Sequence, residues 1–200
     1  VQGPERAVFI GFDVRFHSKK FARAAAEVFA GNGFRVVMMD RPYPTPYVSF
    51  EVKRRRFAGG IVITASHNPP TFNGFKVKAH FGGSATPAIT AQIEKAVGAL
   101  YERRGGPPQP VESQAIETVG PEKHYFEHIK SLVDWDRISK SNLKVVVDSM
   151  HGCGGFILEE MLRDTSCTLH TIRGNPDPLF GGINPEPMMP QLEPLGEAVR

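Results

Sequence analysis

The order of apolar and polar positions predicts a β-α-β unit near the start of the chain. Residues 7–12 form a short apolar run typical of a buried strand, and residues 34–39 form a second one. Between these runs, apolar side chains recur at helical spacing after Ser18, which we expect to cap that helix. A β-α-β unit implies two parallel strands joined by a right-handed crossover.

The same kind of pattern continues toward residue 104. Residues 48–57 fit a short helix, residues 60–64 a buried strand, and residues 75–79 a strand with alternating apolar positions. A further helix is predicted after Thr86, which we expect to cap it. The apolar face of that helix includes Ile89, Ile93, Val97 and Leu100.

A stretch rich in glycine and proline divides the pattern into two parts. We therefore predict a first unit over residues 1–104, a linker over residues 105–120 and a second unit over residues 121–200. The second unit supports only about two strands, fewer than a stable sheet needs. The predicted fold class is α/β, with two α/β/α units whose sheets are mixed and largely parallel, the second unit being incomplete.

Composition is typical of an ordinary globular protein, with 40% hydrophobic and 22% charged residues in a chain of 200. No apolar run approaches the roughly 20 residues of a membrane helix, and the start lacks the pattern of a secretory signal. Cys153 and Cys167 form neither a metal-ligand pattern nor a disulfide framework. These features favour a cytoplasmic location and no membrane partner. They do not indicate an oligomeric state.

The basic run over residues 53–56 is the one strong cluster of positive charge in the chain. Such a run is more often a solvated helix face than a nucleic-acid patch, and no interleaved aromatic residues support base stacking. We therefore expect no nucleic-acid partner.

A serine follows the predicted strand of residues 60–64. Loops at the carboxyl ends of strands are where open α/β sheets bind ligands. Ser66, His67, Asn68 and Lys76 place a hydroxyl, an imidazole, an amide and an ammonium within eleven residues. A serine hydroxyl can accept and return a phosphoryl group, and His67 or Lys76 can supply positive charge or move a proton. From these residues alone, a polar surface loop is an equally good interpretation.

A longer pattern around Ser66 resembles the active-site serine loop of the α-D-phosphohexomutase superfamily, the phosphoglucomutase/phosphomannomutase group. The resemblance covers nearly the whole chain. The segments that carry it are residues 64–69 (Thr-Ala-Ser-His-Asn-Pro), 73–76 (Asn-Gly-Phe-Lys), 11–15 (Gly-Phe-Asp-Val-Arg), 44–46 (Pro-Thr-Pro), 145–148 (Val-Val-Val-Asp) and 184–187 (Asn-Pro-Glu-Pro).

The resemblance implies an isomerase that moves a phosphoryl group reversibly between O1 and O6 of a hexose phosphate, through a phosphoserine and a hexose bisphosphate. By matching position, Ser66 is the phosphoserine, and it binds the metal through its phosphate. His67 and Lys76 are polar active-site residues, with Lys76 the candidate for proton transfer. Arg15 lies in a loop that faces the same site, where it is either a catalytic residue or, with Asp13, a structural clamp.

The resemblance also implies a Mg²⁺ ion held by an Asp-Gly-Asp-x-Asp-Arg loop, a motif that residues 1–200 do not contain. We therefore expect the N-terminal portion of the enzyme, with its first residues truncated, inactive alone and with its carboxylate ligands outside this chain. A non-catalytic sugar-phosphate-binding or regulatory module is the alternative. Thr64 favours a glucose or mannose phosphate as substrate without deciding between them.

Overall fold

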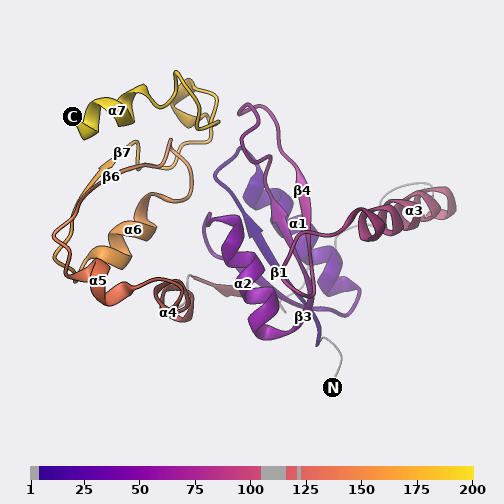
Figure 1. The fold of residues 1–200 in the computed structure, drawn as a ribbon. Helices are drawn as coiled ribbons and strands as arrows, with labels where there is room; N and C mark the ends of the chain where they lie inside the picture. The colour runs from indigo at the N-terminus through magenta and orange to yellow at the C-terminus, as the bar shows by residue number, and fades with distance from the viewer. Residues whose placement is uncertain (1–4, 105–115, 121–122) are drawn as a thin grey trace.

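The computed structural model describes residues 5–104, 116–120 and 123–200. The first sheet has the strand order β4-β3-β1-β2-β5 (Figure 1). Four of its strands are parallel, and β4 alone runs antiparallel, beside β3 at the edge. The strands are β1 (Glu5–Phe12), β2 (Arg35–Met39), β3 (Phe57–Ile63), β4 (Phe75–Ala79) and β5 (Ile116–Val119).

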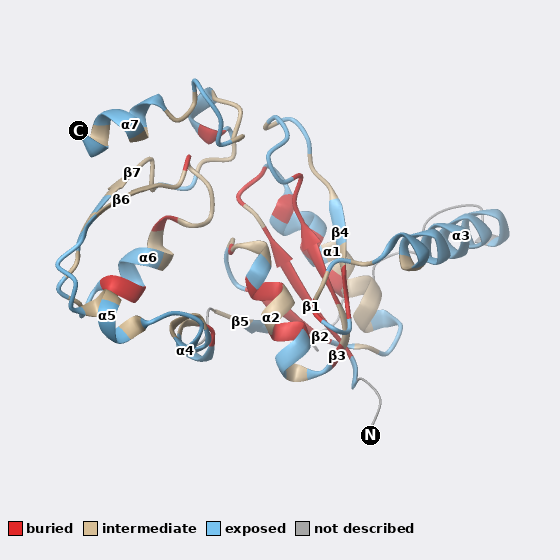
Figure 2. Cartoon of the chain, viewed as in Figure 1, coloured by how far each residue is buried: buried red, intermediate tan, exposed pale blue. Residues whose placement is uncertain are grey.

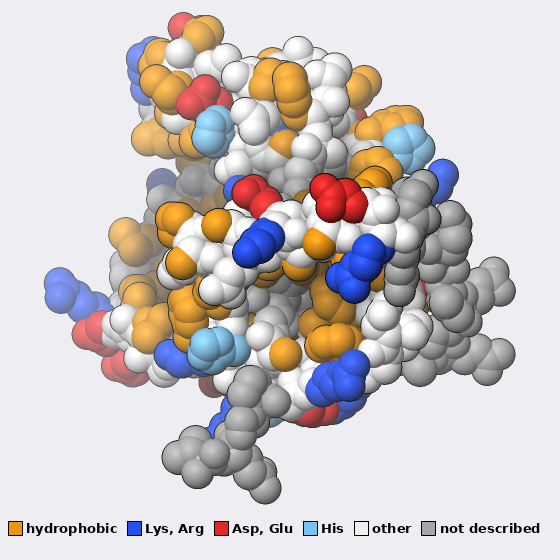
Figure 3. Space-filling model, turned by 90° about the vertical axis from the view of Figure 1, so that its right-hand side faces the viewer, with side chains coloured by type: hydrophobic (Ala, Val, Ile, Leu, Met, Phe, Trp, Pro, Cys, Tyr) orange, Lys and Arg blue, Asp and Glu red, His pale blue; other side chains and the backbone are white. Residues whose placement is uncertain are grey.

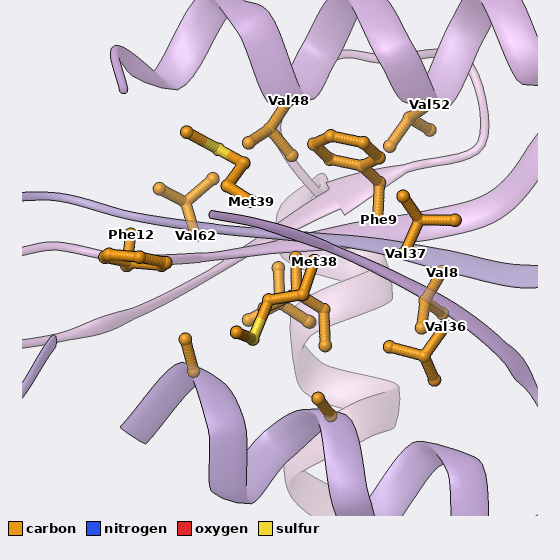
Figure 4. Close-up of a cluster of buried hydrophobic side chains, with 14 of the residues drawn as sticks. Val8, Phe9, Phe12, Val36, Val37, Met38, Met39, Val48, Val52 and Val62 are labelled. Carbon is orange, nitrogen blue, oxygen red and sulfur yellow. The ribbon is translucent and has the colours of Figure 1, made fainter. Parts of the chain in front are cut away.

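Two helices cover opposite faces of this sheet. Helix α1 (Ser18–Gly31) lies on one face and helix α2 (Thr45–Arg55) on the other, with apolar side chains between each helix and the strands (Figure 4). Gly11 permits the close approach of α2, because a Cβ at that position would lie 2.4 Å from Cγ2 of Val48. The buried residues of the described chain are concentrated in these strands and in α2 (Figure 2).

Helix α3 (Pro87–Arg104) stands away from the sheet (Figure 1). Its start agrees with the predicted cap, since Oγ1 of Thr86 accepts a hydrogen bond from the backbone N–H of Ile89 at 3.4 Å. Most of the predicted apolar face is exposed: Ile93, Val97 and Leu100 are 38%, 46% and 38% exposed, whereas Ile89 is half-buried. Figure 3 looks onto this side of the molecule and shows hydrophobic side chains at its surface.

A second unit follows, built around two parallel strands. Strand β6 (Lys144–Asp148) pairs in register with β7 (Thr168–Ile172), and helix α6 (Gly155–Leu162) connects them as a crossover. A single-turn helix, η1 (Phe180–Gly182), and the terminal helix α7 (Glu193–Val199) come after β7. The α/β class, the mixed and largely parallel first sheet and the small second sheet are as predicted.

Two short helices follow β5 and precede β6 along the chain, α4 (Lys123–Ser131) and α5 (Trp135–Ser139). Tyr125 of α4 is buried and belongs to the core of the first unit, where its ring lies 5.1 Å from the ring of Tyr47. The first residues assigned to the second unit therefore pack against the first. None of the helices in the described ranges is long and apolar enough to cross a membrane.

Two local predictions are wrong. Ser18 is not the helix cap: His17 occupies that position with φ of 61°, and the buried Ser18 hydroxyl donates to Asp13 instead. Strand β5 lies within the predicted linker and pairs with β2, so part of that stretch belongs to the first sheet. The remainder of the linker, residues 105–115, lies outside the described residues.

Candidate active site

Ser66 lies in the loop that follows β3, at the carboxyl edge of the parallel strands. Its side chain is exposed, and its backbone has φ of 58°, in the left-handed region that non-glycine residues rarely adopt. Two local hydrogen bonds shape the turn: Ser66 N–H donates to Oγ1 of Thr64 at 3.0 Å, and Asn68 N–H donates to the carbonyl of Ala65 at 3.0 Å. The hydroxyl is thus presented outward from a backbone of defined shape.

Arg15 holds this loop through the loop's own backbone. The residue is 3% exposed, and its guanidinium donates to four carbonyl oxygens of the serine loop. Nη2 donates to the carbonyls of Ser66 and Asn68 at 2.9 and 2.7 Å, and Nη1 donates to those of Pro69 and Phe72 at 2.8 and 3.0 Å. These bonds join segments more than fifty residues apart in the sequence, and they fix the path of the chain on both sides of the hydroxyl.

Asp13 is the anchor of the arginine. Its carboxylate accepts the backbone N–H of Arg15 at 3.0 Å, the Nε–H of Arg15 at 3.1 Å and the hydroxyl of Ser18 at 2.8 Å. The Ser18 hydroxyl in turn accepts a hydrogen bond from the side chain of Asn73 at 2.9 Å, and Asn73 accepts the N–H of Gly74 at 2.8 Å. One network therefore ties the loop after β1 to both ends of the loop that carries Ser66.

His67 and Lys76 lie near the same edge of the sheet but make no such contacts. His67 is exposed beside Ser66, and Lys76 is exposed on β4 opposite Val62. Within the described part of the chain, neither side chain forms a hydrogen bond or an ion pair, and none joins them to Ser66. Two residues further along β4, burial and the neighbouring charge of Lys76 lower the pKa of Lys78.

The second unit contacts this network at the guanidinium of Arg15. The ring of Phe180 lies beneath the Arg15 guanidinium, with 5.0 Å between Cζ and the ring centroid. Burial, together with the negative charge of Asp13, raises the pKa of the Cys153 thiol to about 12. A thiol with this pKa remains protonated near neutral pH, which disfavours Cys153 as a nucleophile.

A second buried carboxylate lies at the carboxyl end of β6. Asp148 accepts hydrogen bonds from Nε of Arg173 at 2.9 Å and from Met150 N–H at 3.0 Å, and the Asp148 side chain is 1% exposed. Burial alone would raise the pKa of this carboxyl, but the hydrogen bonds from Arg173 and Met150 more than offset it, and the pKa is lowered. Arg173 also donates to the carbonyl of Gln191 at 2.8 Å, which ties the chain after η1 to the end of the sheet.

The basic run of residues 53–56 is partly used inside the fold. Glu51 is fully buried on α2, and its carboxylate accepts hydrogen bonds from Arg54 at 2.8 Å and from Arg55 at 2.5 Å. Arg55 also lies 3.8 Å from the carboxylate of Glu117 on β5. Two of the four positive charges therefore neutralise a buried carboxylate within the domain.

The described residues do not by themselves form a metal site, because no group of three or more His, Cys, Asp or Glu side chains among them is placed to hold an ion. Asp13 and Asp148 are already bound to arginines.

Of the four predicted site residues, the structure joins Arg15 and Ser66 directly and places His67 and Lys76 at the same edge. Phe180, which reaches Arg15 from the second unit, was not predicted from the sequence. The available signal was weak: an aromatic residue before the pair Gly181-Gly182 in an otherwise loop-like stretch.

A mixed sheet covered on both faces, with a serine loop at its carboxyl edge and a second parallel β-α-β unit against that loop, defines a class of α/β proteins built from successive α/β/α domains. Within this class the chain belongs to the phosphoglucomutase/phosphomannomutase family. The family model for α/β/α domain I matches residues 2–104, and the one for α/β/α domain II matches residues 123–200.

Curated relatives agree with this assignment. A phosphoglucomutase of Staphylococcus saprophyticus is 32% identical over 166 residues, which covers 80% of this chain and 30% of the relative. A phosphoglucomutase of Staphylococcus aureus (strain bovine RF122 / ET3-1) is 32% identical over 193 residues, which covers 90% of this chain and 34% of the relative. The chain thus spans about a third of the length of these relatives.

Solved structures share the fold. One match is the crystal structure of a Thermus thermophilus protein that carries the name phosphomannomutase, with a TM-score of 0.81 and 37% identity. The match covers 96% of this chain and 43% of the Thermus thermophilus chain. The Paramecium phosphoprotein pp63/parafusin matches in its open form with a TM-score of 0.77 over 98% of this chain and 41% of its own. At 20% identity, that second likeness shows the fold alone.

Proposed function

We propose that this chain is the phosphoserine-bearing portion of a phosphohexomutase and that Ser66 is the residue that gives and takes the phosphoryl group. The observation that carries the proposal is the exposed Ser66 hydroxyl on a loop whose backbone Arg15 clamps at four carbonyls. Phosphoryl transfer depends mainly on positioning and charge neutralisation, and a serine fixed in this way meets the first requirement.

The proposed reaction moves one phosphoryl group at a time. A hydroxyl oxygen of a hexose monophosphate attacks the phosphorus on Ser66, the bond from phosphorus to Oγ breaks, and a hexose bisphosphate forms. The proton lost by the sugar hydroxyl is balanced by the proton that Oγ gains. After the bisphosphate turns around, Oγ attacks its other phosphorus, the bond from that phosphorus to the sugar oxygen breaks, and the sugar oxygen takes the proton that Oγ loses. The released hexose phosphate then carries its phosphate on O6 where it was on O1, or the reverse.

The remaining predicted residues take supporting roles in this proposal. Lys76 and His67 have side chains that no described residue engages, so Lys76 is free to pass the proton and His67 to stabilise phosphate charge. Arg15 is better suited to positioning than to catalysis, because it is buried and each of its side-chain donors has a protein acceptor.

We also propose a glucose or mannose phosphate as substrate, Mg²⁺ as the metal and the cytoplasm as the location, as the family resemblance implies. This chain would contribute one metal ligand, the phosphate on Ser66, with carboxylate ligands supplied from outside residues 1–200. Bound there, the ion would neutralise phosphate charge. Since the described residues alone do not fit a metal, we expect these 200 residues to show no mutase turnover on their own.

The test uses the complete enzyme and the variant Ser66→Ala, with Ser131→Ala as the matched control. Intact mass should show a gain of ~80 Da in the wild type and in Ser131→Ala, and no gain in Ser66→Ala. Hexose phosphate isomerisation in a coupled assay should fall at least about a thousandfold in Ser66→Ala only. Normal turnover by Ser66→Ala would overturn the assignment. Hexose phosphate binding without any phosphorylation would instead support the non-catalytic binding module.

A further inference from the structure

The guanidinium of Arg15 has two kinds of surface, and the serine loop uses only one of them. Its N–H groups lie at the edge of the planar group and are directed at the loop carbonyls and Asp13. The flat face is left for another partner. Phe180 of the second unit covers it, with 5.0 Å between Cζ of Arg15 and the ring centroid, and Phe180 is 5% exposed.

The turn that carries Phe180 is closed by hydrogen bonds within its own unit. The carboxylate of Asp177 accepts the N–H groups of Leu179 at 3.0 Å and Gly181 at 2.9 Å, which closes the single turn that carries the ring. Asp177 N–H donates to the carbonyl of His151 at 3.0 Å. Gly181 has φ of 65°, and a Cβ there would lie 2.7 Å from Nε2 of His151, so the turn packs closely on that imidazole.

Phe180 also lies apart from the hydrophobic core. The core cluster of the first unit does not include Phe180, and the partner that the structure describes for its ring in that unit is the charged guanidinium of Arg15. An aromatic face attracts a guanidinium electrostatically, and it excludes water from the donors that the loop carbonyls use.

We propose that Phe180 is a positioning residue for Ser66: its ring keeps the guanidinium of Arg15 in the plane that binds the serine-loop carbonyls, so the second unit controls the order of the loop in the first. The role of this loop in phosphoryl transfer rests on the proposed function above. The physical link between Phe180 and the order of the loop does not.

The first readout is amide hydrogen exchange at Ser66, Asn68 and Phe72, whose N–H groups are hydrogen-bonded within the loop. In the complete enzyme, Phe180→Leu keeps the apolar bulk but removes the aromatic face, and these amides should exchange about tenfold faster while the amides of β1 and β3 are unchanged. Phe180→Trp retains an aromatic face and should restore exchange to within about threefold of the wild type.

The matched control is Phe156→Leu. Phe156 is also an aromatic residue of the second unit beneath an arginine of the first, with 4.6 Å between its ring centroid and Cζ of Arg41. Among the described residues its ring contacts are with Arg41 and Tyr43, outside the serine loop. Its variant should leave the loop amides at wild-type exchange rates. If Phe180→Leu does not fold, Phe180→Met is read by the same criteria.

The second readout is kinetic. With a hexose phosphate, Phe180→Leu should lower kcat about tenfold with KM within about twofold, because the phosphoryl group is misplaced while sugar binding persists. Loop exchange that is unchanged in Phe180→Leu, or equally raised in Phe156→Leu, would overturn the proposal. Faster loop exchange in an enzyme whose Ser66 never carries phosphate would support the positioning role and refute the proposed function, so the two failures are distinguishable.

Discussion

Arg15 shows how one side chain can determine the shape of a loop. Its five N–H donors meet Asp13 and four carbonyls, in the fixed planar arrangement of a guanidinium. A lysine ammonium has three donors around a point and cannot reproduce this arrangement. Because Arg15 is buried, the carbonyls that a substitution leaves unpaired would be poorly compensated by water.

The expected cost of Arg15→Lys is therefore large. We predict that it lowers the free energy of unfolding by about 3 kcal/mol, as urea denaturation would measure. Arg41→Lys, which changes an exposed arginine, should stay within about 0.5 kcal/mol. An equal effect of the two variants would contradict the clamp.

At the level of elements, α2 and α3 differ sharply although both have apolar positions at helical spacing. Helix α2 packs on the sheet, and Val52 is fully buried in the core. Helix α3 carries Val97, Leu100 and Tyr101 at its surface, with exposures of 46%, 38% and 51%. Spacing alone therefore predicts a helix and its apolar face but does not say whether that face is packed.

This difference predicts unequal costs for the same substitution. Val52→Ala should lower the free energy of unfolding by about 2 kcal/mol, because it removes two buried methyl groups and leaves a cavity. Val97→Ala should change it by less than about 0.5 kcal/mol. Thermal denaturation of both variants would measure the difference, and a large loss in Val97→Ala would show that α3 is packed in solution.

At the scale of the whole molecule, the two units meet through side chains, not through a shared sheet. Tyr43 of the first unit lies 5.3 Å from the ring of Phe156, and Phe180 lies under Arg15. Within the second unit, the Asp148–Arg173 pair joins the ends of β6 and β7.

That pair gives stability a dependence on pH. The pKa of Asp148 is lower in the folded chain than its ordinary value, so its contribution is complete above about pH 4 and is lost as the pH falls through the folded pKa. Asp148→Asn should lower the free energy of unfolding at pH 7 by about 3 kcal/mol and flatten its decline in acid. Chemical denaturation at about pH 7 and pH 3 would measure both, and an unchanged acid decline would assign it to other carboxyls.

The sequence predicted those features that depend on neighbouring residues and missed those that depend on distant ones. The strand before Ser66 and the loop around it are encoded in one continuous stretch. The four carbonyl contacts of Arg15 span more than fifty residues, so the sequence could only offer clamp and catalysis as alternatives. Ser18 was wrongly predicted to cap the helix because its hydroxyl donates a hydrogen bond to Asp13 instead. Strand β5 was not predicted because it has only four residues, one of which is the charged Glu117.

The clamp on the serine loop has a consequence for how such an enzyme can change over time. In the serine loop, Arg15 binds only backbone carbonyl oxygens, which every amino acid carries, so these bonds do not depend on the side chains of Asn68, Pro69 and Phe72. Replacements there can alter the surface of the loop while the hydroxyl of Ser66 stays in place. Substitutions at these three positions can therefore accumulate without displacing Ser66.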